Sequence, residues 1–365
     1  MLEAMMPYLT NQHDNPASQH SYGYNALEAI EQARRQVAAA VGAQANQVVF
    51  TASGTEANNF AVSGIAGNMG QEQILTSQIE HPCVSNPAKA MQTRGNWKAN
   101  NIAVDSNCQL ETQDLQTKLE APTDLASVML ANNETGAIPN IETVVALAKA
   151  KKVFVHIDAV QALGKIDVDF TALGVHAMTI SSHKISGPLD TGALVLNKRV
   201  DIQPLLHGGG QEKGLRSGTE NTAAIVGFSE ACELTLLGLN DFASHTATLR
   251  AALEVSLKEL NAAVFGQQAT RLPNTSFFAF ENIEGEKLVP ALDKLGFAVA
   301  SGSACSNRGG GPSHVLLAMG IEEDLARGGI RVSFNQKNTQ EQVSEFFVAL
   351  KQILHDLRQM TAVAA

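Results

Sequence analysis

Ala177-Met178-Thr179-Ile180-Ser181-Ser182-His183-Lys184 is the stretch of this sequence that defines its fold and its site most clearly. It joins a short apolar run, typical of a buried strand, to hydroxyl residues, a histidine and a lysine. A turn led by Gly187-Pro188 follows the lysine. Upstream, a second apolar run, Val153-Phe154-Val155-His156-Ile157, ends at Asp158. The sequence therefore predicts a lysine and an aspartate at the ends of two strands.

A lysine and an acid at two strand ends are the side chains that pyridoxal phosphate (PLP) requires. The lysine forms a Schiff base with the cofactor, and the acid partners the pyridinium nitrogen. A solvated surface charge is the commoner role of a single lysine after a strand, and it is the alternative for Lys184. The pairing with Asp158, together with the phosphate and thiol motifs described below, favours the PLP site.

Seven short apolar runs alternate with helical patterns between Asn46 and about Leu196. The runs are Gln47–Phe50, Gln73–Thr76, Ile102–Val104, Ser127–Leu130, Val153–Ile157, Ala177–Ile180 and Gly192–Leu196. This alternation predicts an α/β fold with a mainly parallel, seven-stranded sheet wrapped by helices. Ligands of such sheets lie at the carboxyl ends of the strands, where Asp158 and Lys184 are expected.

A second region begins near Asn240 with a long helical pattern. Strand-like runs at Thr275–Phe280 and Ile330–Phe334 and a closing helix at Gln340–Leu357 indicate a smaller α+β domain. We therefore expect a large PLP-binding domain in residues 1–240. We expect a small C-terminal domain in residues 241–365, and this domain carries the cysteine loop described below.

The composition narrows the class of protein. Of the 365 residues, 44% are hydrophobic and 17% are charged, and the net charge is −10, which argues against nucleic-acid or anionic-membrane binding. No apolar run reaches the roughly twenty residues of a membrane span. The four cysteines are scattered without a Cys-x-x-Cys pair, which argues against a metal site or a disulfide framework. A cytoplasmic, reduced setting fits this pattern best.

Two motifs suggest phosphate binding. Ser53-Gly54-Thr55-Glu56 follows an apolar run and opens a helical pattern, where glycine permits close approach and Thr55 offers a hydroxyl. An ordinary helix cap has the same sequence. His207-Gly208-Gly209-Gly210 leads to Arg216-Ser217-Gly218-Thr219, whose side chains supply donors. A plain glycine-rich surface loop is the alternative there.

Three further motifs follow predicted strands or lie in them. His81, in Glu80-His81-Pro82, can stack on a cofactor ring or move protons, or can simply begin a helix. Asn133 lies in Asn132-Asn133-Glu134-Thr135-Gly136, which also fits a tight turn. Arg331 lies in an apolar run and can bind a carboxylate with two hydrogen bonds, or can be a surface arginine.

One cysteine has the setting of a reactive thiol. Cys305 lies in Ser301-Gly302-Ser303-Ala304-Cys305-Ser306, and Asn307-Arg308-Gly309-Gly310-Gly311-Pro312 follows it. Polar, glycine-rich neighbours favour an accessible thiolate, whereas cysteines as a class are more often buried and inert. Cys232, in contrast, falls in an apolar helical pattern and is expected in the core.

Together these motifs resemble the cysteine desulfurases, within the class V aminotransferase-like group of fold-type I PLP enzymes. The resemblance runs over nearly the whole chain and includes the following motifs: Asn15-Pro16-Ala17-Ser18, Thr51-x-Ser53-Gly54-Thr55-Glu56-Ala57-x-Asn59, Asn132-Asn133-Glu134-Thr135-Gly136, His156-x-Asp158-Ala159-x-Gln161, Ser182-His183-Lys184, His207-Gly208-Gly209-Gly210, Arg216-Ser217-Gly218-Thr219 and Ser303-Ala304-Cys305. The long loop after Cys305 is similar to the branch that serves nitrogenase and housekeeping iron–sulfur assembly.

The resemblance implies a role for each matching residue. The implied PLP ligands are Gly54, Thr55, His81, Asn133, Asp158, Gln161, Ser181, His183, Lys184 and, from the other subunit of a homodimer, Thr219. Lys184, His81 and Cys305 are the implied catalytic residues. Asn133 and Arg331 are the implied ligands of the substrate carboxylate.

The implied reaction converts L-cysteine to L-alanine. The sulfur moves to Cys305 as a persulfide and then to an acceptor protein, such as an iron–sulfur scaffold, for cluster or thio-cofactor assembly. A selenocysteine lyase or another class V aminotransferase is one alternative. A weakly active module for sulfur relay or partner binding is an alternative of another class.

The chain departs from the family pattern in two places. Relatives have a short strand and an Ala-Thr-Thr segment ahead of the point where Met1 stands. This segment lies near the substrate in relatives, and the lack of it in this sequence motivates the relay alternative. Leu189-Asp190 stands where relatives usually carry a basic or polar residue and then glycine. We expect the added carboxylate to perturb the lysine loop.

Overall fold

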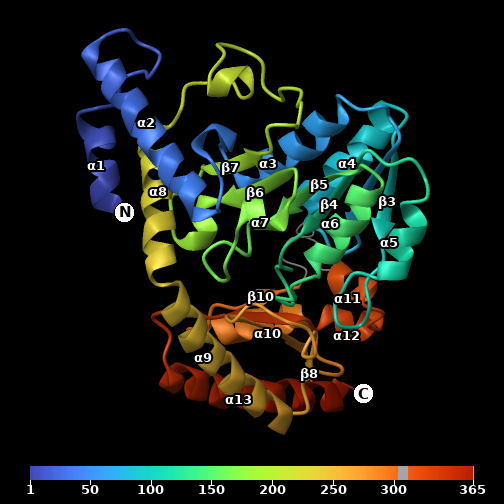
Figure 1. Ribbon diagram of the computed structural model, residues 1–365. Coiled ribbons are helices and arrows are strands. Elements are labelled where there is room, and N and C mark those ends of the chain that lie inside the picture. Colours follow the sequence, from blue (N-terminus) through green and yellow to red (C-terminus); the bar gives the residue numbers. More distant parts are fainter. Residues whose placement is uncertain (303–310, 365) are drawn as a thin grey trace. The chain divides into compact units, whose positions relative to one another are not determined.

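Figure 1 shows the computed structural model of the protein, which describes residues 1–302 and 311–364, with side chains of the last helix through Gln359. The chain divides into two compact units. Unit 1 comprises Met1–Ile102, Thr112–Leu130 and Asn140–Leu239, and unit 2 comprises Ala103–Glu111, Ala131–Pro139 and Asn240–Ala365. The domain division at residue 240 stays a prediction.

A seven-stranded sheet forms the centre of unit 1, with strand order β1-β7-β6-β5-β4-β2-β3. The strands are β1 (Val48–Thr51), β2 (Gln73–Ser77), β3 (Lys98–Ile102), β4 (Leu125–Met129), β5 (Phe154–Asp158), β6 (Ala177–Ser181) and β7 (Gly192–Leu196). β7 runs antiparallel to β1 and β6, whereas the other pairs are parallel. The predicted mainly parallel, seven-stranded sheet is confirmed.

The strand expected at Ile102–Val104 is wrong. β3 covers Lys98–Ile102 and lies at the edge of the sheet, paired with β2. Most of its residues are exposed, and its sequence, Lys-Ala-Asn-Asn-Ile, is polar. An edge strand has one unpaired side and little burial, so its sequence lacks the apolar run that marks a central strand.

Helices cover this sheet and hold its core. They are α1 (Leu2–Thr10), α2 (Ser21–Ala40), α3 (Gly54–Asn59), α4 (Pro82–Arg94), α5 (Thr112–Lys118), α6 (Ile141–Ala150), α7 (Phe170–Leu173) and α8 (Thr222–Leu237). α8 packs on both α1 and α2, as Figure 1 shows. Phe60, Ile65, Ile74, Leu125 and Leu194 are buried together on one side of the sheet. This burial is the main force that fixes the strand ends described below.

Unit 2 contains a four-stranded antiparallel sheet of order β10-β11-β9-β8. Its strands are β8 (Ala263–Val264), β9 (Thr275–Ala279), β10 (Ala300–Ser301) and β11 (Ile330–Ser333), and its helices are α9 (Leu239–Glu259), α10 (Gly285–Asp293), α11 (His314–Ala318), α12 (Glu323–Arg327) and α13 (Gln340–Ala364). Phe278, Leu288, Ile330 and Phe346 share its buried core with Leu253 of α9. The expected smaller α+β architecture is present.

Membrane-spanning potential is low among the described helices. No single one is both long and apolar enough to cross a bilayer. α8 and α9, which a short break separates, pass the length and composition test only when they are taken as a bent pair.

Candidate active site

Asp158 and Lys184 follow adjacent parallel strands of unit 1. Asp158 is the last residue of β5, and it lies beside Thr179 of β6 in the parallel register. Lys184 lies in a short 3₁₀ turn, η3 (Ser182–Ile185), that directly follows β6. The two residues therefore lie at the carboxyl ends of two neighbouring strands, as the sequence predicts.

The lysine turn has a tightly packed exit. Ser186 ends η3 with φ of 61°, in the left-handed region. Gly187 follows, and a Cβ at that position would lie 2.1 Å from Oγ of Ser182. Any residue larger than glycine would therefore force the side chain of Ser182, in the turn that presents Lys184, to move.

Asp158 is a buried carboxylate with two N–H donors. Its Oδ1 accepts from the amide of Val160 at 2.9 Å, and its Oδ2 accepts from Nδ2 of Asn58 at 2.7 Å. Burial nevertheless raises the pKa of Asp158, although both hydrogen bonds and the charge of Lys184 act to lower it. A cationic N–H partner would stabilise this charge further, and the protonated ring nitrogen of PLP is such a partner.

Asn58 itself is incompletely satisfied. Its side chain is fully buried, and its Oδ1 has no hydrogen-bond partner among the described residues. A buried amide oxygen without a partner is uncommon in a folded protein and indicates a missing group. The surroundings of Asp158 therefore fit a polar cofactor ring.

Gly54 and Ser181 lie against each other at the predicted phosphate end of the site. A Cβ on Gly54 would lie 2.9 Å from Cγ2 of Val160 and 3.2 Å from Cβ of Ser181. Glycine thus lets the start of α3, with Thr55, approach the end of β6. Ser53 caps α3, because its Oγ accepts from the amide of Glu56 at 3.1 Å.

Ser181 and His183 form a hydroxyl–imidazole pair. The Oγ of Ser181 lies 3.0 Å from Nδ1 of His183, and Ser181 is buried. Burial and the neighbouring Lys184 lower the pKa of His183. A neutral imidazole, a serine hydroxyl and the hydroxyl of Thr55 are donors that suit a phosphate, so this end of the site also fits PLP.

His81 begins α4 as its N-cap residue. Its Nδ1 accepts from the amide of Cys83 at 3.2 Å and lies 2.8 Å from Sγ of Cys83. The preceding residue, Glu80, is buried, and its Oε1 accepts from the Ser77 hydroxyl at 2.5 Å and from the Met129 amide at 2.8 Å. Burial raises the pKa of Glu80 to about 8. Glu80 therefore ties the segment that carries His81 to β2 and β4.

Two predicted cofactor ligands have other surroundings. The Oε1 of Gln161 accepts from Nζ of Lys165 at 2.5 Å. Thr219 is exposed and lines a cavity of about 200 Å³ together with Asp190, Thr191 and Arg216, among others. Neither Asp158 nor Lys184 lines that cavity. The expected action of Thr219 on a second subunit stays a prediction.

The guanidinium of Arg216 is paired with the carboxylate of Glu56, and its role as a phosphate donor stays a prediction. Its Nε donates to Oε1 of Glu56 at 2.7 Å and its Nη2 to Oε2 at 3.2 Å. Oε2 of Glu56 also accepts from the amide of Ala52 at 3.0 Å. The glycine-rich loop is thus tied to the first turn of α3, next to Thr55.

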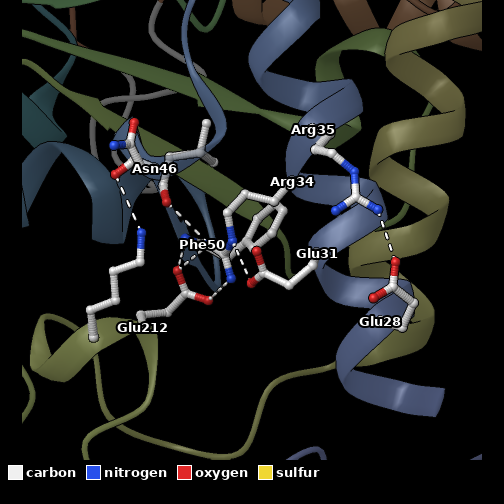
Figure 2. A network of polar contacts seen from close by, with 9 residues as sticks. Glu28, Glu31, Arg34, Arg35, Asn46, Phe50 and Glu212 are labelled. Atoms are coloured by element: carbon white, nitrogen blue, oxygen red, sulfur yellow. Dashed lines mark hydrogen bonds and ion pairs between the residues drawn. The ribbon is translucent and has the colours of Figure 1, made fainter. Parts of the chain in front are cut away.

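A buried ion pair holds the same loop to β1. Figure 2 shows Arg34 of α2 facing Glu212, with Nη1–Oε2 and Nη2–Oε1 distances of 2.6 and 2.8 Å. Oε2 of Glu212 also accepts from the amide of Phe50 at 2.9 Å, and the guanidinium lies 4.8 Å from the centre of the Phe50 ring. This network joins α2, β1 and the loop that leads to Thr219.

Asp190 and Leu189 mark the departure from the family pattern. Asp190 has φ of 55°, in the left-handed region that glycine adopts without strain. Its side chain lines the same cavity as Thr219, and Leu189 is 74% exposed. The expected effect of this carboxylate on the lysine loop stays a prediction.

Unit 2 brings together the two residues predicted to hold the substrate carboxylate. The Oδ1 of Asn132 accepts from the amides of Glu134 and Thr135, both at 2.9 Å, and so shapes a tight turn. In that turn the carbonyl oxygen of Asn133 accepts from Nη1 of Arg331 at 2.7 Å. The Oδ1 of Asn133 is buried and has no hydrogen-bond partner among the described residues. The amide of Asn133 can therefore serve an incoming polar group.

Glu134 lies beside described residues on both sides of the cysteine segment. Its Oε2 accepts from the Ser313 hydroxyl at 2.5 Å and would lie 3.2 Å from a Cβ on Gly302. Burial raises its pKa to about 7, while the Ser313 hydrogen bond and Arg331 act to lower it. Cys305 itself lies outside the described residues, in 303–310.

Within the described ranges, the remaining cysteines, Cys83, Cys108 and Cys232, form no disulfide bond. Cys232 is buried in α8, as expected. No group of three or more His, Cys, Asp or Glu side chains in those ranges is arranged to hold a metal ion.

Several residues of the site were not predicted. They are Arg34, Asn58, Cys83, Glu134 and Glu212. Each acts through a partner distant in sequence or through local capping, so no motif marks its role. Glu134 and Asn58 lay within predicted motifs, but Asn58 stood at an unspecified position and only the turn-forming neighbours of Glu134 drew attention.

The profile of the aminotransferase class-V family matches residues 1–346. A cysteine desulfurase of a Nostoc species is 39% identical over 364 residues, which cover 99% of this chain and 91% of the relative. A cysteine desulfurase IscS of Clostridium botulinum is 36% identical over 367 residues, with coverage of 99% and 92%.

Solved structures show the same likeness. A NifS-like protein is similar with a TM-score of 0.91 and 35% identity, over 97% of this chain and 95% of the other. A NifS-like protein from Rickettsia africae has a TM-score of 0.87 and 31% identity, with the same coverage.

Proposed function

Since the chain belongs to the class-V aminotransferase family and, within it, to the cysteine desulfurases, we propose that it is a PLP-dependent cysteine desulfurase that converts L-cysteine to L-alanine. The observation that carries this function is the placement of Asp158 and Lys184 at the ends of adjacent parallel strands. An acid for the ring nitrogen and a lysine for covalent attachment are the two side chains that PLP chemistry requires.

Several residues would hold the cofactor. Asp158 would bind the ring nitrogen and keep it protonated, and His81 would stack on the ring. Gly54, Thr55, Ser181 and His183 would surround the phosphate. Gln161 would donate to the ring hydroxyl through its Nε2, because its Oε1 accepts from Lys165. When bound, PLP withdraws electrons from the substrate and so weakens the bond between carbon and sulfur.

Other residues would hold the substrate and move its protons. Lys184 would attach the cofactor through Nζ and carry the substrate's α-proton at that atom. His81 would take part in proton transfer through its imidazole. Asn133 and Arg331 would hold the α-carboxylate of L-cysteine, an interaction for which a guanidinium is well suited.

Cys305 would accept the sulfur. Its thiolate would attack the substrate sulfur, so that a new S–S bond forms as the C–S bond breaks. The electron pair of the broken bond would remain with the carbon, which takes a proton to give L-alanine. The products are then alanine and a persulfide on Cys305.

We also propose a homodimer, in which Thr219 reaches the phosphate of the partner subunit. The exposure of Thr219, which leaves its hydroxyl accessible to a second subunit, supports this arrangement. Light scattering of the purified protein tests it, since a monomer at micromolar concentration would contradict it. We further propose a cytoplasmic location and an iron–sulfur scaffold protein as sulfur acceptor.

The function is tested by incubating the protein with PLP, L-cysteine and a thiol reductant. We expect alanine and sulfide in equal amounts. Cys305→Ala should lose this activity, whereas an aminotransferase would keep its own. L-selenocysteine serves as a comparison substrate that separates a desulfurase from a selenocysteine lyase. PLP-loaded protein that releases neither product from L-cysteine would contradict the proposed function.

A further inference from the structure

The thiol of Cys83 lies at the start of α4, next to the imidazole of His81. His81 is the N-cap residue, Pro82 occupies the first helical turn, and the side chain of His81 folds back over the first amide groups. The amide of Cys83 donates to Nδ1 of His81 at 3.2 Å. A backbone N–H can only donate, so Nδ1 carries a lone pair there and the neutral ring carries its hydrogen on Nε2.

The thiol has defined donor and acceptor partners. Sγ of Cys83 lies 2.8 Å from Nδ1 of His81 and 3.1 Å from Nδ2 of Asn58. The amide nitrogen of Asn58 can only donate, so the sulfur is the acceptor in that contact. The hydrogen of the thiol is then available for the lone pair on Nδ1.

The thiol keeps its hydrogen near neutral pH. Burial raises the pKa of Cys83 to about 12, and the carboxylates of Asp158 and Glu80 act in the same direction. Asn58 and the hydroxyl of Thr55 act to lower it. A thiol in this state is a hydrogen-bond donor and a poor nucleophile, which separates Cys83 from the role proposed for Cys305.

Asn58 extends this contact to the carboxylate of Asp158. Its Nδ2 lies 2.7 Å from Oδ2 of Asp158 as well as 3.1 Å from Sγ of Cys83, so its two amide hydrogens serve the two partners. Asn58 is fully buried, so solvent does not compete for these two contacts. The four side chains form one directed chain, in which Asn58 donates to Asp158 and to Cys83, and Cys83 donates to His81.

We propose that Cys83 is a positioning residue whose S–H donates to Nδ1 of His81, holds the imidazole as its Nε2–H tautomer and connects it through Asn58 to Asp158. This inference deepens the proposed function and rests on it for its catalytic consequence, since His81 acts on the cofactor ring only in that setting. The consequence is that Nε2 carries the hydrogen that His81 can offer. Without the thiol, Nδ1 loses its closer donor and keeps the 3.2 Å contact with the amide of Cys83, so the ring is freer to turn and to exchange tautomers.

The tautomer is measured by ¹⁵N NMR of the histidine rings at neutral pH, without substrate and with and without PLP. His81→Gln assigns the signals of His81. In the wild type we expect Nδ1 to have the shift of an unprotonated ring nitrogen and Nε2 that of a protonated one. In Cys83→Ala we expect both shifts to move toward averaged values, and in Cys83→Ser, whose hydroxyl also donates, we expect them to move back.

Cys232→Ala is the control, because it removes a buried thiol of α8 that makes none of the contacts of this cluster given above. Thermal unfolding of each variant shows whether it is folded. Unchanged His81 shifts in folded Cys83→Ala, or a wild-type ring with its hydrogen on Nδ1, would overturn the proposal. This result requires no turnover, so it stands apart from any failure of the proposed function.

Kinetics provide the second measurement. Loss of one hydrogen bond to His81 should lower kcat for L-cysteine by about 3- to 10-fold with little change in KM. Cys83→Ser should recover most of this loss, and Cys232→Ala should keep wild-type kcat. A Cys83→Ala variant that raises KM alone, or that Cys83→Ser fails to rescue, would contradict the positioning role.

Discussion

The buried ion pair between Arg34 and Glu212 offers a sharp test of how the site is held together. Its side chains are 6% and 2% exposed, and two N–O contacts of 2.6 and 2.8 Å join them (Figure 2). Arg35, the next residue, pairs with Glu28 at 3.0 Å, but those side chains are 50% and 75% exposed. Arg34→Met and Arg35→Met are therefore a matched pair that differs in burial.

The two substitutions should lower the free energy of unfolding by very different amounts. Arg34→Met leaves the carboxylate of Glu212 buried with the amide of Phe50 but without its guanidinium, which costs about 3–5 kcal/mol in the free energy of unfolding. Methionine keeps much of the apolar packing over the Phe50 ring, so the loss is mainly electrostatic. Arg35→Met should cost about 1 kcal/mol or less, because solvent already weakens the exposed pair.

Urea unfolding followed by circular dichroism measures both values. We expect Glu212→Gln in the Arg34→Met background to recover part of the loss, since a neutral amide can still accept from Phe50. The coupling between the two positions should exceed about 1.5 kcal/mol. Two results would refute the importance of the buried pair. One is a loss of unfolding free energy in Arg34→Met no larger than that in Arg35→Met. The other is a double variant of Arg34 and Glu212 whose loss equals the sum of the two single losses.

Three further predictions concern single side chains. Asp158→Asn should weaken PLP binding and lower kcat on the order of 100-fold, whereas Asp167→Asn, at an exposed position, should change neither. Absorbance titration with PLP measures binding, and alanine release measures kcat. If the two variants had the same PLP affinity and the same kcat, the role of Asp158 would be contradicted. Burial lowers the pKa of His156 to about 3, so its neutral ring stabilises the fold above about pH 6.5 and this stabilisation is lost as pH falls toward 3. The urea midpoint should therefore drop between pH 7 and pH 5, and drop less in His156→Gln; equal drops would refute this. Finally, iodoacetamide should modify Cys83 slowly at pH 8 and faster at higher pH, as mass spectrometry of its peptide reports, and rapid modification at pH 8 would contradict its raised pKa.

The residues at strand ends were predictable because local pattern sets them. The apolar runs of two central strands end at Asp158 and just before Lys184. Because these strands are parallel, their carboxyl ends lie next to each other. The edge strand β3 was misplaced, because exposure removes the apolar pattern on which such a prediction depends. The pairing of Asn133 with Arg331 followed from the family resemblance and not from spacing.

The supporting contacts were not predictable from the sequence. Arg34 and Glu212 meet across 178 positions, and Glu134 and Ser313 across 179. Such pairs depend on how helices and loops pack, which periodicity does not specify. Cys83 directly follows the Glu80-His81-Pro82 motif, but its contact with Asn58 joins residues 25 positions apart and so was not predictable.

The identity of the cofactor lysine tests the central claim most directly. PLP-loaded protein is reduced with borohydride, digested and mapped by mass spectrometry, which locates the pyridoxyl group on one residue. The account predicts the group on Lys184 and its loss in Lys184→Ala. A pyridoxyl group on another lysine, such as Lys165 beside Gln161, or on none, would contradict the placement of the active site between Asp158 and Lys184.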